Sequence, residues 1–367
     1  MGKSSSISVS CALLLSFLIG AHLVSAQKPK DKTRPRPQLI KREAAPAPES
    51  NLLTSANSNE AAPEVSDDDV VRVETNLVST LFTAVDSQHR FLTNLQQQDI
   101  RVLENGVPQS ISVFQRESDL PLSLAVLIDV SKSQERTLPD EQRAANEFLA
   151  AILRPNKDQA TAISFNGAAL MEQALTGNTD SLKDAINRLK VEVPPDNPDC
   201  DPEDITVEDD PRCWSGIWDA VWASTNEVLS QTPERTRRAI ILMTDGDDTS
   251  SLTKVNEAID FAVRNNVLVY GIGIGDRKEF HIDEESLRKL AERTGGRAFF
   301  PLNESDLRGA FALIEQELRS QYLIAYSPQN KLRDGSFRRL KIEVLNPELR
   351  KQKLKLLYRQ GYYAKHQ

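Results

Sequence analysis

The chain has 367 residues and a mass of 41.0 kDa, which is enough for about two domains. It carries 45 Lys and Arg against 53 Asp and Glu, so its net charge is −8 and it lacks the basic footprint of a general nucleic-acid-binding protein. With only 4 His and 3 Cys, neither a His-rich zinc site nor a dense disulfide scaffold is expected.

The first 26 residues have the pattern of a secretory signal peptide. Lys3 gives a positive start, residues 7–24 are apolar or small, and a small-x-small cleavage pattern ends at Ala26. An uncleaved N-terminal anchor is the alternative. No other stretch reaches the roughly 18 apolar residues that a spanning helix needs. The sequence therefore predicts an exported protein, periplasmic or secreted, with no transmembrane span after signal cleavage.

Export determines how the cysteines are interpreted. Cys11 leaves with the signal, so Cys200 and Cys213 remain, and a disulfide is the simplest state for two cysteines in an oxidising compartment. Closing so short a loop would stabilise the fold by about 3 kcal/mol through the chain entropy lost from the unfolded state. Two free thiols in a mobile loop are the alternative.

Two different patterns follow the signal. Residues 27–69 are expected to be a disordered Pro-rich linker, because six of the 19 prolines fall here and few residues could form a core. Residues 70–118 form an N-terminal β segment of short strands, with Glu104-Asn105-Gly106 as a hairpin turn. Three or four short strands are too few for a robust sheet of their own.

Residues 119–321 change to an α/β pattern. Three apolar runs, at residues 122–128, 239–243 and 267–274, are typical of strands buried on both faces. Further strands are expected at residues 160–165 and 298–301. Helical periodicity appears at residues 137–153, 181–189, 217–229, 251–265 and 284–293, and again after Asn303, a candidate helix cap. Alternating strands and helices predict a doubly wound, mostly parallel sheet.

The β character returns in residues 322–365. Strands are expected at residues 322–326, 337–344 and 354–358. Because each β segment alone would make a marginal sheet, we expect the C-terminal segment to pack with residues 70–118 in a small β-sandwich-like domain. The α/β domain would then be inserted between the two halves of that domain.

Oxygen-bearing side chains follow two of the buried strands. Asp-x-Ser-x-Ser comes after the first, and Thr-Asp-Gly after the run at 239–243. Ligands in such sheets bind outside the carboxyl ends of the strands, so these side chains should meet at one edge. They are Asp129, Ser131, Ser133 and Asp245. Carboxylate and hydroxyl oxygens suit Mg²⁺, Mn²⁺ or Ca²⁺ rather than zinc. Ser and Asp that merely cap helices, without metal, are the alternative.

This set resembles the metal-ion-dependent adhesion site of the von Willebrand factor type A domain, a Rossmann-like fold. The family pattern is Asp-x-Ser-x-Ser, then a Thr before a Leu-Tyr-Asp-Ala-like helix start, and then the Asp of a Thr-Asp-Gly-like turn. Here Ser215 stands in the place of the Thr, before Ile-Trp-Asp-Ala. Ser keeps the hydroxyl and loses the methyl group. Thr176 and Thr179 are the alternative donors, although they precede a different helix.

The flanking β segments narrow the resemblance to a von Willebrand factor A-related family common in acidobacterial secretomes. The matching stretches are residues 99–109, 295–301, 322–328, 334–344 and 359–364. The resemblance implies an exported protein without catalytic activity. It also implies that the ion keeps one coordination position open for an Asp or Glu of a partner protein. We therefore expect divalent-metal-dependent protein binding of the adhesion type.

An acidic insertion at residues 190–213 runs into Ser215. It holds nine acidic side chains, six of them between the two cysteines. The expected ligand-binding rim beside the metal consists of Lys132, Trp214, Asp209 and Asp210. Such a rim would select partners by charge. A solvated surface loop is the alternative.

Two other classes of function are open at this point. A structural envelope component would use the metal only to stabilise its fold. A metal-assisted hydrolase would need a general base near the metal-bound water. The histidines that remain after signal cleavage, His89, His281 and His366, do not adjoin the metal motifs in the sequence. We therefore expect no enzyme activity.

Overall fold

The structure is a computed structural model that describes residues 36–42, 77–88, 90–117, 119–194, 210–275 and 281–366. All of these belong to the compact unit Arg36–Gln367, and the unit Met1–Pro35 lies outside the description. The predicted signal peptide, most of the predicted linker, Cys200 and Asp209 also lie outside the described residues. Within the described part, no helix has the length and apolar character needed to cross a membrane.

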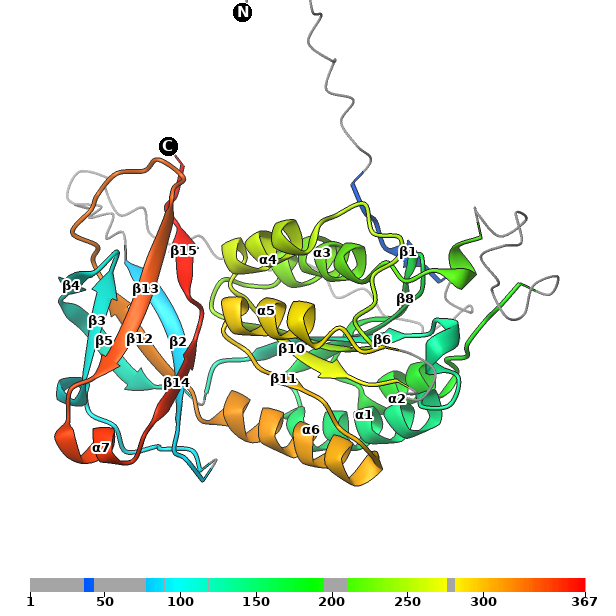
Figure 1. The fold of residues 1–367 in the computed structure, drawn as a ribbon, viewed down its shortest axis with the longest axis horizontal. Helices are drawn as coiled ribbons and strands as arrows, with labels where there is room; N and C mark the ends of the chain where they lie inside the picture. The colour runs from blue at the N-terminus through cyan, green and yellow to red at the C-terminus, as the bar shows by residue number, and fades with distance from the viewer. Residues whose placement is uncertain are drawn as a thin grey trace, which may run out of the picture. The chain divides into compact units, whose positions relative to one another are not determined.

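A seven-stranded sheet with the order β1-β8-β7-β6-β9-β10-β11 forms the middle of the α/β part (Figure 1). Its strands are β1 (Ile40–Lys41), β6 (Leu122–Asp129), β7 (Gln159–Phe165), β8 (Ala169–Thr176), β9 (Arg237–Thr244), β10 (Val267–Gly273) and β11 (Ala298–Phe299). All neighbours pair in parallel except β7 and β8. The mostly parallel α/β sheet predicted from the sequence is therefore confirmed.

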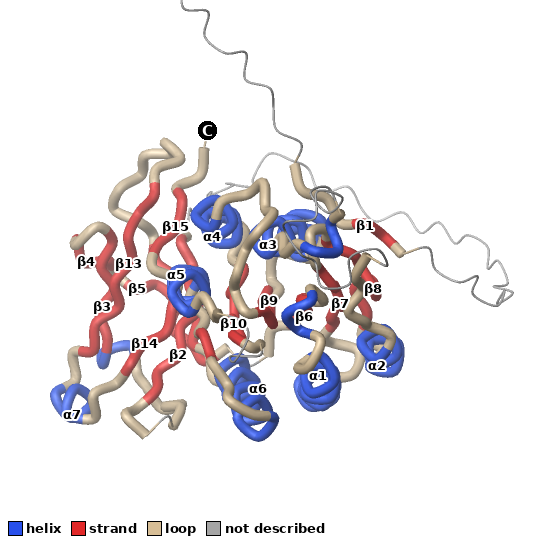
Figure 2. Tube along the Cα trace, turned by 45° about the vertical axis from the view of Figure 1, so that its right-hand side comes forward, coloured by secondary structure: helices blue, strands red, loops and turns tan. Residues whose placement is uncertain are grey.

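Helices cover both faces of this sheet, as Figure 2 shows from a second direction. One face carries α1 (Leu138–Ile152), α2 (Thr179–Asn187) and α6 (Glu304–Arg319); the other carries α3 (Ile217–Glu227), α4 (Val255–Arg264) and α5 (Glu284–Thr294). Successive residues of a strand face opposite sides, so Leu124 joins one core and Ala125 the other. Short 3-10 turns are η1 (Gln97–Asp99), η2 (Lys132–Gln134), η3 (Pro211–Cys213) and η4 (Leu229–Gln231).

Two four-stranded antiparallel sheets combine strands from before and after the α/β part, around a third apolar core. Their orders are β14-β2-β12-β5 and β15-β13-β3-β4. The earlier strands are β2 (Val78–Val85), β3 (Ile100–Glu104), β4 (Val107–Gln109) and β5 (Ile111–Arg116). The later elements are β12 (Tyr322–Tyr326), β13 (Phe337–Val344), α7 (Pro347–Lys351), β14 (Lys355–Tyr358) and β15 (Gly361–Tyr363). β12 lies between β2 and β5, and β13 pairs with β3.

A buried carboxylate lies inside this pair of sheets. Glu104, at the end of β3, forms an ion pair with Arg338 at 3.4 Å, and both side chains are only 2% exposed. The hydroxyls of Tyr326 and Tyr362 each donate a hydrogen bond to Glu104 Oε2 at 2.8 Å. The fold itself therefore neutralises this negative charge.

Two elements differ from the sequence-based expectation. Residues 36–42 fall in the predicted linker, yet they contain β1, which pairs with Leu170 and Met171 of β8. Leu39 is buried, and its N–H donates to Glu227 Oε1 at 2.9 Å. β8 itself is not predicted, because most of its residues are half-buried and show no clear alternation. The linker and the α/β segment are thus joined by strand pairing at the sheet edge.

Candidate metal centre

Asp129 ends β6 at the carboxyl edge of the sheet and is fully buried. Its Oδ1 accepts a hydrogen bond from the Ser131 N–H at 2.9 Å, and its Oδ2 accepts one from the Thr244 hydroxyl at 2.6 Å. Thr244 ends β9, the neighbour of β6. The two adjacent strand ends therefore hold the Asp129 carboxylate from both sides.

Asp245 follows β9 directly and is 3% exposed. Its Oδ1 accepts from the Asp247 N–H at 3.1 Å, and its carbonyl oxygen accepts from the Asp283 N–H at 2.9 Å. Gly246 then turns the chain with φ of +88°, a conformation that residues with a Cβ rarely adopt. A Cβ at Gly246 would also lie 3.0 Å from the Asp283 carbonyl oxygen. The turn therefore requires glycine to keep Asp245 at the strand end.

The loop after β6 brings two hydroxyls together. The Oγ atoms of Ser131 and Ser133 lie 3.1 Å apart, and the buried Gln134 amide donates to Ser133 Oγ at 3.3 Å and to the Ile274 carbonyl at 3.2 Å. Ser131 precedes η2 without making a side-chain cap hydrogen bond. The alternative that this serine serves only as a helix cap is therefore not supported.

The electrostatics of the two carboxylates fit a cation. Burial raises the pKa of Asp129 to about 7, and the nearby charge of Asp245 adds to the effect. Burial also raises the pKa of Asp245, although the Ser133 hydroxyl opposes this shift. Among the described residues, no Lys or Arg lies at ion-pair distance from either carboxylate. Two buried carboxylates without a basic partner, beside two hydroxyls, are a donor set that a divalent oxygen-seeking cation would satisfy.

Ser215 is tied to the loop that carries Asp245. Its N–H donates to Thr249 Oγ1 at 2.7 Å, and its carbonyl accepts from the N–H groups of Thr249 and Ser250 at 2.9 and 3.1 Å. Ser215 is 5% exposed, and its own hydroxyl has no hydrogen-bond partner among the described residues. Main-chain bonds thus position Ser215 beside the β9 loop and leave its hydroxyl available.

The alternative hydroxyl donors, Thr176 and Thr179, lie at the opposite end of the sheet strands from Asp129. β8 runs antiparallel to β7, so Thr176 pairs with Ala160 near the start of β7, whereas Asp129 pairs with Phe165 at its end. Thr179 begins α2, three residues later. The missed strand β8 is therefore the reason that neither threonine reaches the site.

The predicted rim is only partly described. Asp210 caps η3 and binds the Arg212 guanidinium at 2.6 Å, and these bonds lower the pKa of Asp210 to about 2. Lys132 forms an ion pair with Glu135 at 2.7 Å. Trp214 is half-buried directly before Ser215. The charges of Lys132 and Asp210 are therefore paired within the chain. The predicted disulfide partner of Cys213 is outside the described residues, so that bond stays a prediction.

The sequence did not single out three residues that shape this edge. Thr244 stood out in the sequence only as part of the Thr-Asp-Gly motif, yet its hydroxyl donates a hydrogen bond to Asp129. Asp248 accepts from the Ile217 N–H at 2.8 Å and from the Ser251 hydroxyl at 2.5 Å, which fixes the start of α3. No spacing rule links residues 31 positions apart. Glu141 is the third.

Glu141 lies on α1, fully buried, and neither of its carboxylate oxygens has a hydrogen-bond partner within the described part of the chain. Burial raises the pKa of Glu141 to about 8, and the charges of Asp129 and Asp245 contribute to that shift. No group of three or more His, Cys, Asp or Glu residues within the described ranges is placed to hold a metal. Glu141 therefore lies close enough to interact electrostatically with Asp129 and Asp245, without belonging to a three-carboxylate cluster.

Part of the chain matches the sequence model of a known protein family. Residues 215–312 match the von Willebrand factor type A domain, a stretch that begins at Ser215 and does not include the Asp129 motif. Together with the α/β architecture, this match identifies the fold as von Willebrand factor A-like. The narrower resemblance to an acidobacterial exported family stays a prediction.

Relatives with related sequences or folds are distant. A UPF0353 protein of Mycolicibacterium gilvum is 25% identical over 216 residues, which cover 53% of this chain and 59% of that protein. A von Willebrand factor type A structure from Catenulispora acidiphila has a TM-score of 0.44 and 13% identity, covering 75% of this chain and 74% of its own. BatB from Bacteroides thetaiotaomicron has a TM-score of 0.42 and 18% identity, covering 54% and 100%. The chain thus spans about three-fifths of the length of the curated relative.

Proposed function

We propose that this protein is an exported, divalent-metal-dependent protein-binding module of the adhesion type. Asp129, Ser131, Ser133, Ser215 and Asp245 would hold the ion, which is Mg²⁺, Mn²⁺ or Ca²⁺. When bound, the ion supplies a coordination position for an Asp or Glu side chain of a partner protein. No step of this function requires a catalytic residue.

The observation that carries the proposal is the pair of buried carboxylates at the ends of β6 and β9. A buried carboxylate without a compensating charge is costly, and one removed from water is normally paired or bound to a metal. Asp129 and Asp245 are 0% and 3% exposed and have no basic partner in the described chain. A cation between the two strand ends would remove this cost.

The composition of the donor set favours an acidic ligand. Three of the five proposed donors are neutral serine hydroxyls, which bind a divalent ion more weakly than a carboxylate does, so the ion would gain from a further anionic oxygen. Lys132 and Asp210 are already paired with Glu135 and Arg212. The open coordination position of the bound ion would then be the feature presented to a partner, which supports recognition of a carboxylate.

The first test is metal binding measured by isothermal titration calorimetry with Mg²⁺, Mn²⁺ and Ca²⁺. Asp129→Ala should lower the affinity at least 100-fold, because the central carboxylate is lost. Asp129→Asn keeps the side-chain shape and should lose affinity similarly while remaining folded. The matched control is Glu135→Ala, which removes an exposed carboxylate six residues along the same loop. Equal affinity in Asp129→Asn and in the unmodified protein would reject the metal site.

The second test separates binding from a structural role of the metal. Envelope proteins captured by the chain in Mg²⁺ should be released by EDTA, and Asp129→Asn should not capture them. In the structural alternative, Asp129→Asn would lower only the melting temperature measured with Mg²⁺ present. Capture of the same partners in EDTA and in Mg²⁺ would exclude metal-dependent binding.

A further inference from the structure

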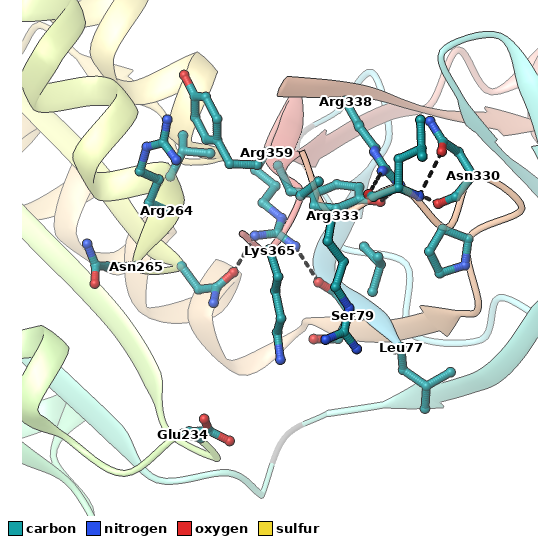
Figure 3. Close-up of a pocket in the computed structure, with 18 of the residues that line it drawn as sticks. Leu77, Ser79, Glu234, Arg264, Asn265, Asn330, Arg333, Arg338, Arg359 and Lys365 are labelled. Atoms are coloured by element: carbon teal, nitrogen blue, oxygen red, sulfur yellow. Dashed lines mark hydrogen bonds between the residues drawn. The ribbon is translucent and has the colours of Figure 1, made fainter. Parts of the chain in front are cut away.

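A basic cavity lies at the amino end of strand β9, whereas the metal centre lies at its carboxyl end. It has a volume of about 430 Å³ and is lined by the start of β9, the end of α4, the start of β2, the loop between β12 and β13, and the C-terminal residues (Figure 3). Arg238 is the second residue of β9, and Asp245 directly follows its last residue. Seven residue steps along a strand span roughly 23 Å, so the two sites are separate.

The charge of this cavity is opposite to that of the whole chain. Seven basic side chains and one acidic side chain, Glu234, line it, although the protein carries a net charge of −8. One of the seven, Arg338, is neutralised by Glu104. The other six are Arg238, Arg264, Lys331, Arg333, Arg359 and Lys365. Figure 3 shows Arg264, Arg333, Arg359 and Lys365 around the same space.

Arg359 is held by neutral groups. Its guanidinium donates to the Asn266 side-chain oxygen and, at 2.6 Å, to the Ser79 carbonyl, and its buried Nε has no acceptor. No carboxylate of the described residues lies at ion-pair distance from it. Desolvation lowers the pKa of Arg359 to about 10, so the side chain remains charged at neutral pH. The cavity thus contains a partly buried cation that lacks a counter-ion.

Like Arg359, Arg238 and Arg264 contact neutral groups. Arg238 is 9% exposed and donates to the Thr232 hydroxyl at 2.8 Å, the Thr232 carbonyl at 2.7 Å and the Asn265 carbonyl at 3.1 Å. Arg264 stacks over the Tyr363 ring at 3.5 Å. Carbonyl groups and an aromatic face orient a guanidinium without cancelling its charge. The positive potential of the cavity is therefore built into the fold.

The mouth of the cavity is partly apolar. Leu77 and Leu332 line it and are 45% and 65% exposed. Its volume falls in the range of small-molecule sites, which combine apolar walls with a few converging polar groups. A ligand suited to this shape carries an anionic group and a short apolar part.

We propose that this basic cavity is a binding site for a small oxyanion ligand, one that carries a phosphate or carboxylate group. Arg359, Arg264, Lys331 and Lys365 contact the anion, and Arg238 contributes charge from the wall. The guanidinium groups match the geometry of phosphate and carboxylate oxygens. The site shares no residue with the metal centre, so it stands whether or not the proposed metal-dependent function is correct.

The test is isothermal titration calorimetry on the full chain at low ionic strength, with inorganic phosphate and succinate as separate probes. Saturable binding of either anion is expected, and the tighter of the two identifies the preferred group. Arg359→Gln should weaken that binding at least tenfold. Lys183→Gln, on the exposed surface of α2, is the control of equal charge change and should bind as the unmodified protein does.

Arg359 also connects β2 to the turn before β10, so Arg359→Gln could fail to fold. The double variant Arg264→Gln/Lys365→Gln removes two exposed charges instead and should weaken binding at least fivefold. EDTA and Asp129→Asn should leave anion binding unchanged. The proposal is overturned if neither anion saturates the unmodified protein, or if Lys183→Gln loses as much affinity as the cavity variants do.

Discussion

Two buried carboxylate sites in this protein differ in whether a basic side chain lies beside them. In the β-sandwich part, Glu104 has Arg338 at 3.4 Å and two tyrosine hydroxyls at 2.8 Å. At the carboxyl ends of the α/β strands, Asp129 has one hydroxyl and one main-chain N–H as hydrogen-bond donors, and no described basic side chain lies at ion-pair distance. The sandwich neutralises its buried carboxylate with its own side chains, whereas Asp129 and Asp245 have no basic partner among the described residues.

The difference separates a structural role from a functional one. The Glu104–Arg338 ion pair lies within one sheet, the Tyr326 hydroxyl links it to the other sheet, and loss of the pair affects stability. Carboxylates without a basic partner cost stability and persist where they serve a function. The contrast therefore predicts that substitutions in the sandwich network change unfolding, and that those at the sheet edge change ligand binding.

The largest stability effect is expected from Glu104→Gln. This change leaves the Arg338 charge buried without its partner, which should lower the free energy of unfolding by about 3–5 kcal/mol. Urea unfolding followed by circular dichroism measures it. The control is Glu343→Gln, which breaks the surface pairs with Arg101 and Lys341 and should cost less than about 1 kcal/mol. Similar losses in both variants would contradict the distinction between the two environments.

A smaller effect, counted as the change in the free energy of unfolding per pH unit, is expected from Glu141. The pKa of Glu141 is about 8 in the folded protein and 4.5 in its ordinary state, so between these values the folded state holds a proton that the unfolded state has released. Stability should therefore fall as the pH rises from 4.5 to 8, by up to about 1.4 kcal/mol per pH unit from this group. Glu141→Gln should remove that part of the slope.

The measurement is urea unfolding in EDTA at several pH values, because a bound metal would mask the carboxylates. Asp129 adds a slope of the same sign, so the difference between Glu141→Gln and the unmodified protein is the relevant quantity. Glu147→Gln, at an exposed position of α1, controls for the loss of one carboxylate. Parallel pH profiles for all three proteins would show that Glu141 does not carry the effect.

The smallest effect is expected on metal affinity, from substitutions at Ser215. Ser215→Thr keeps the hydroxyl and restricts its rotamers, so it should raise the metal affinity by less than about tenfold. Ser215→Ala removes the hydroxyl and should lower the affinity in the same calorimetric titration. If both variants bind metal as the unmodified protein does, Ser215 is not a ligand. Melting temperatures measured in EDTA control for overpacking at this buried position.

Much of the α/β architecture could be predicted because its strands are long apolar runs. The expected strands at residues 122–128 and 267–274 correspond to β6 and β10, and Asn303 caps α6 by accepting from the Asp306 N–H at 3.0 Å. β8 could not be predicted, since a half-buried strand near the sheet edge carries little periodicity. Its antiparallel direction decides which end of the sheet Thr176 occupies.

The candidate site was predictable to the extent that its residues follow strands. Asp129, Ser131, Ser133 and Asp245 are found where the strand ends place them. Asp248 and Gln134 act through contacts between segments far apart in the sequence, and no local spacing indicates such contacts. The basic cavity was not predictable for the same reason, because its lining residues come from five separate segments.

The strand β1 has a consequence for how copies of this protein behave toward one another. An open sheet edge presents unpaired N–H and C=O groups, to which a second chain can add. Ile40 and Lys41 occupy part of that edge on β8, and Arg42 binds Glu172 beside them at 2.5 Å. A two-residue strand flanked by a charged side chain is a poor template for further strand addition. Residues 36–42 thereby also cover part of the edge at which a second copy could add a strand.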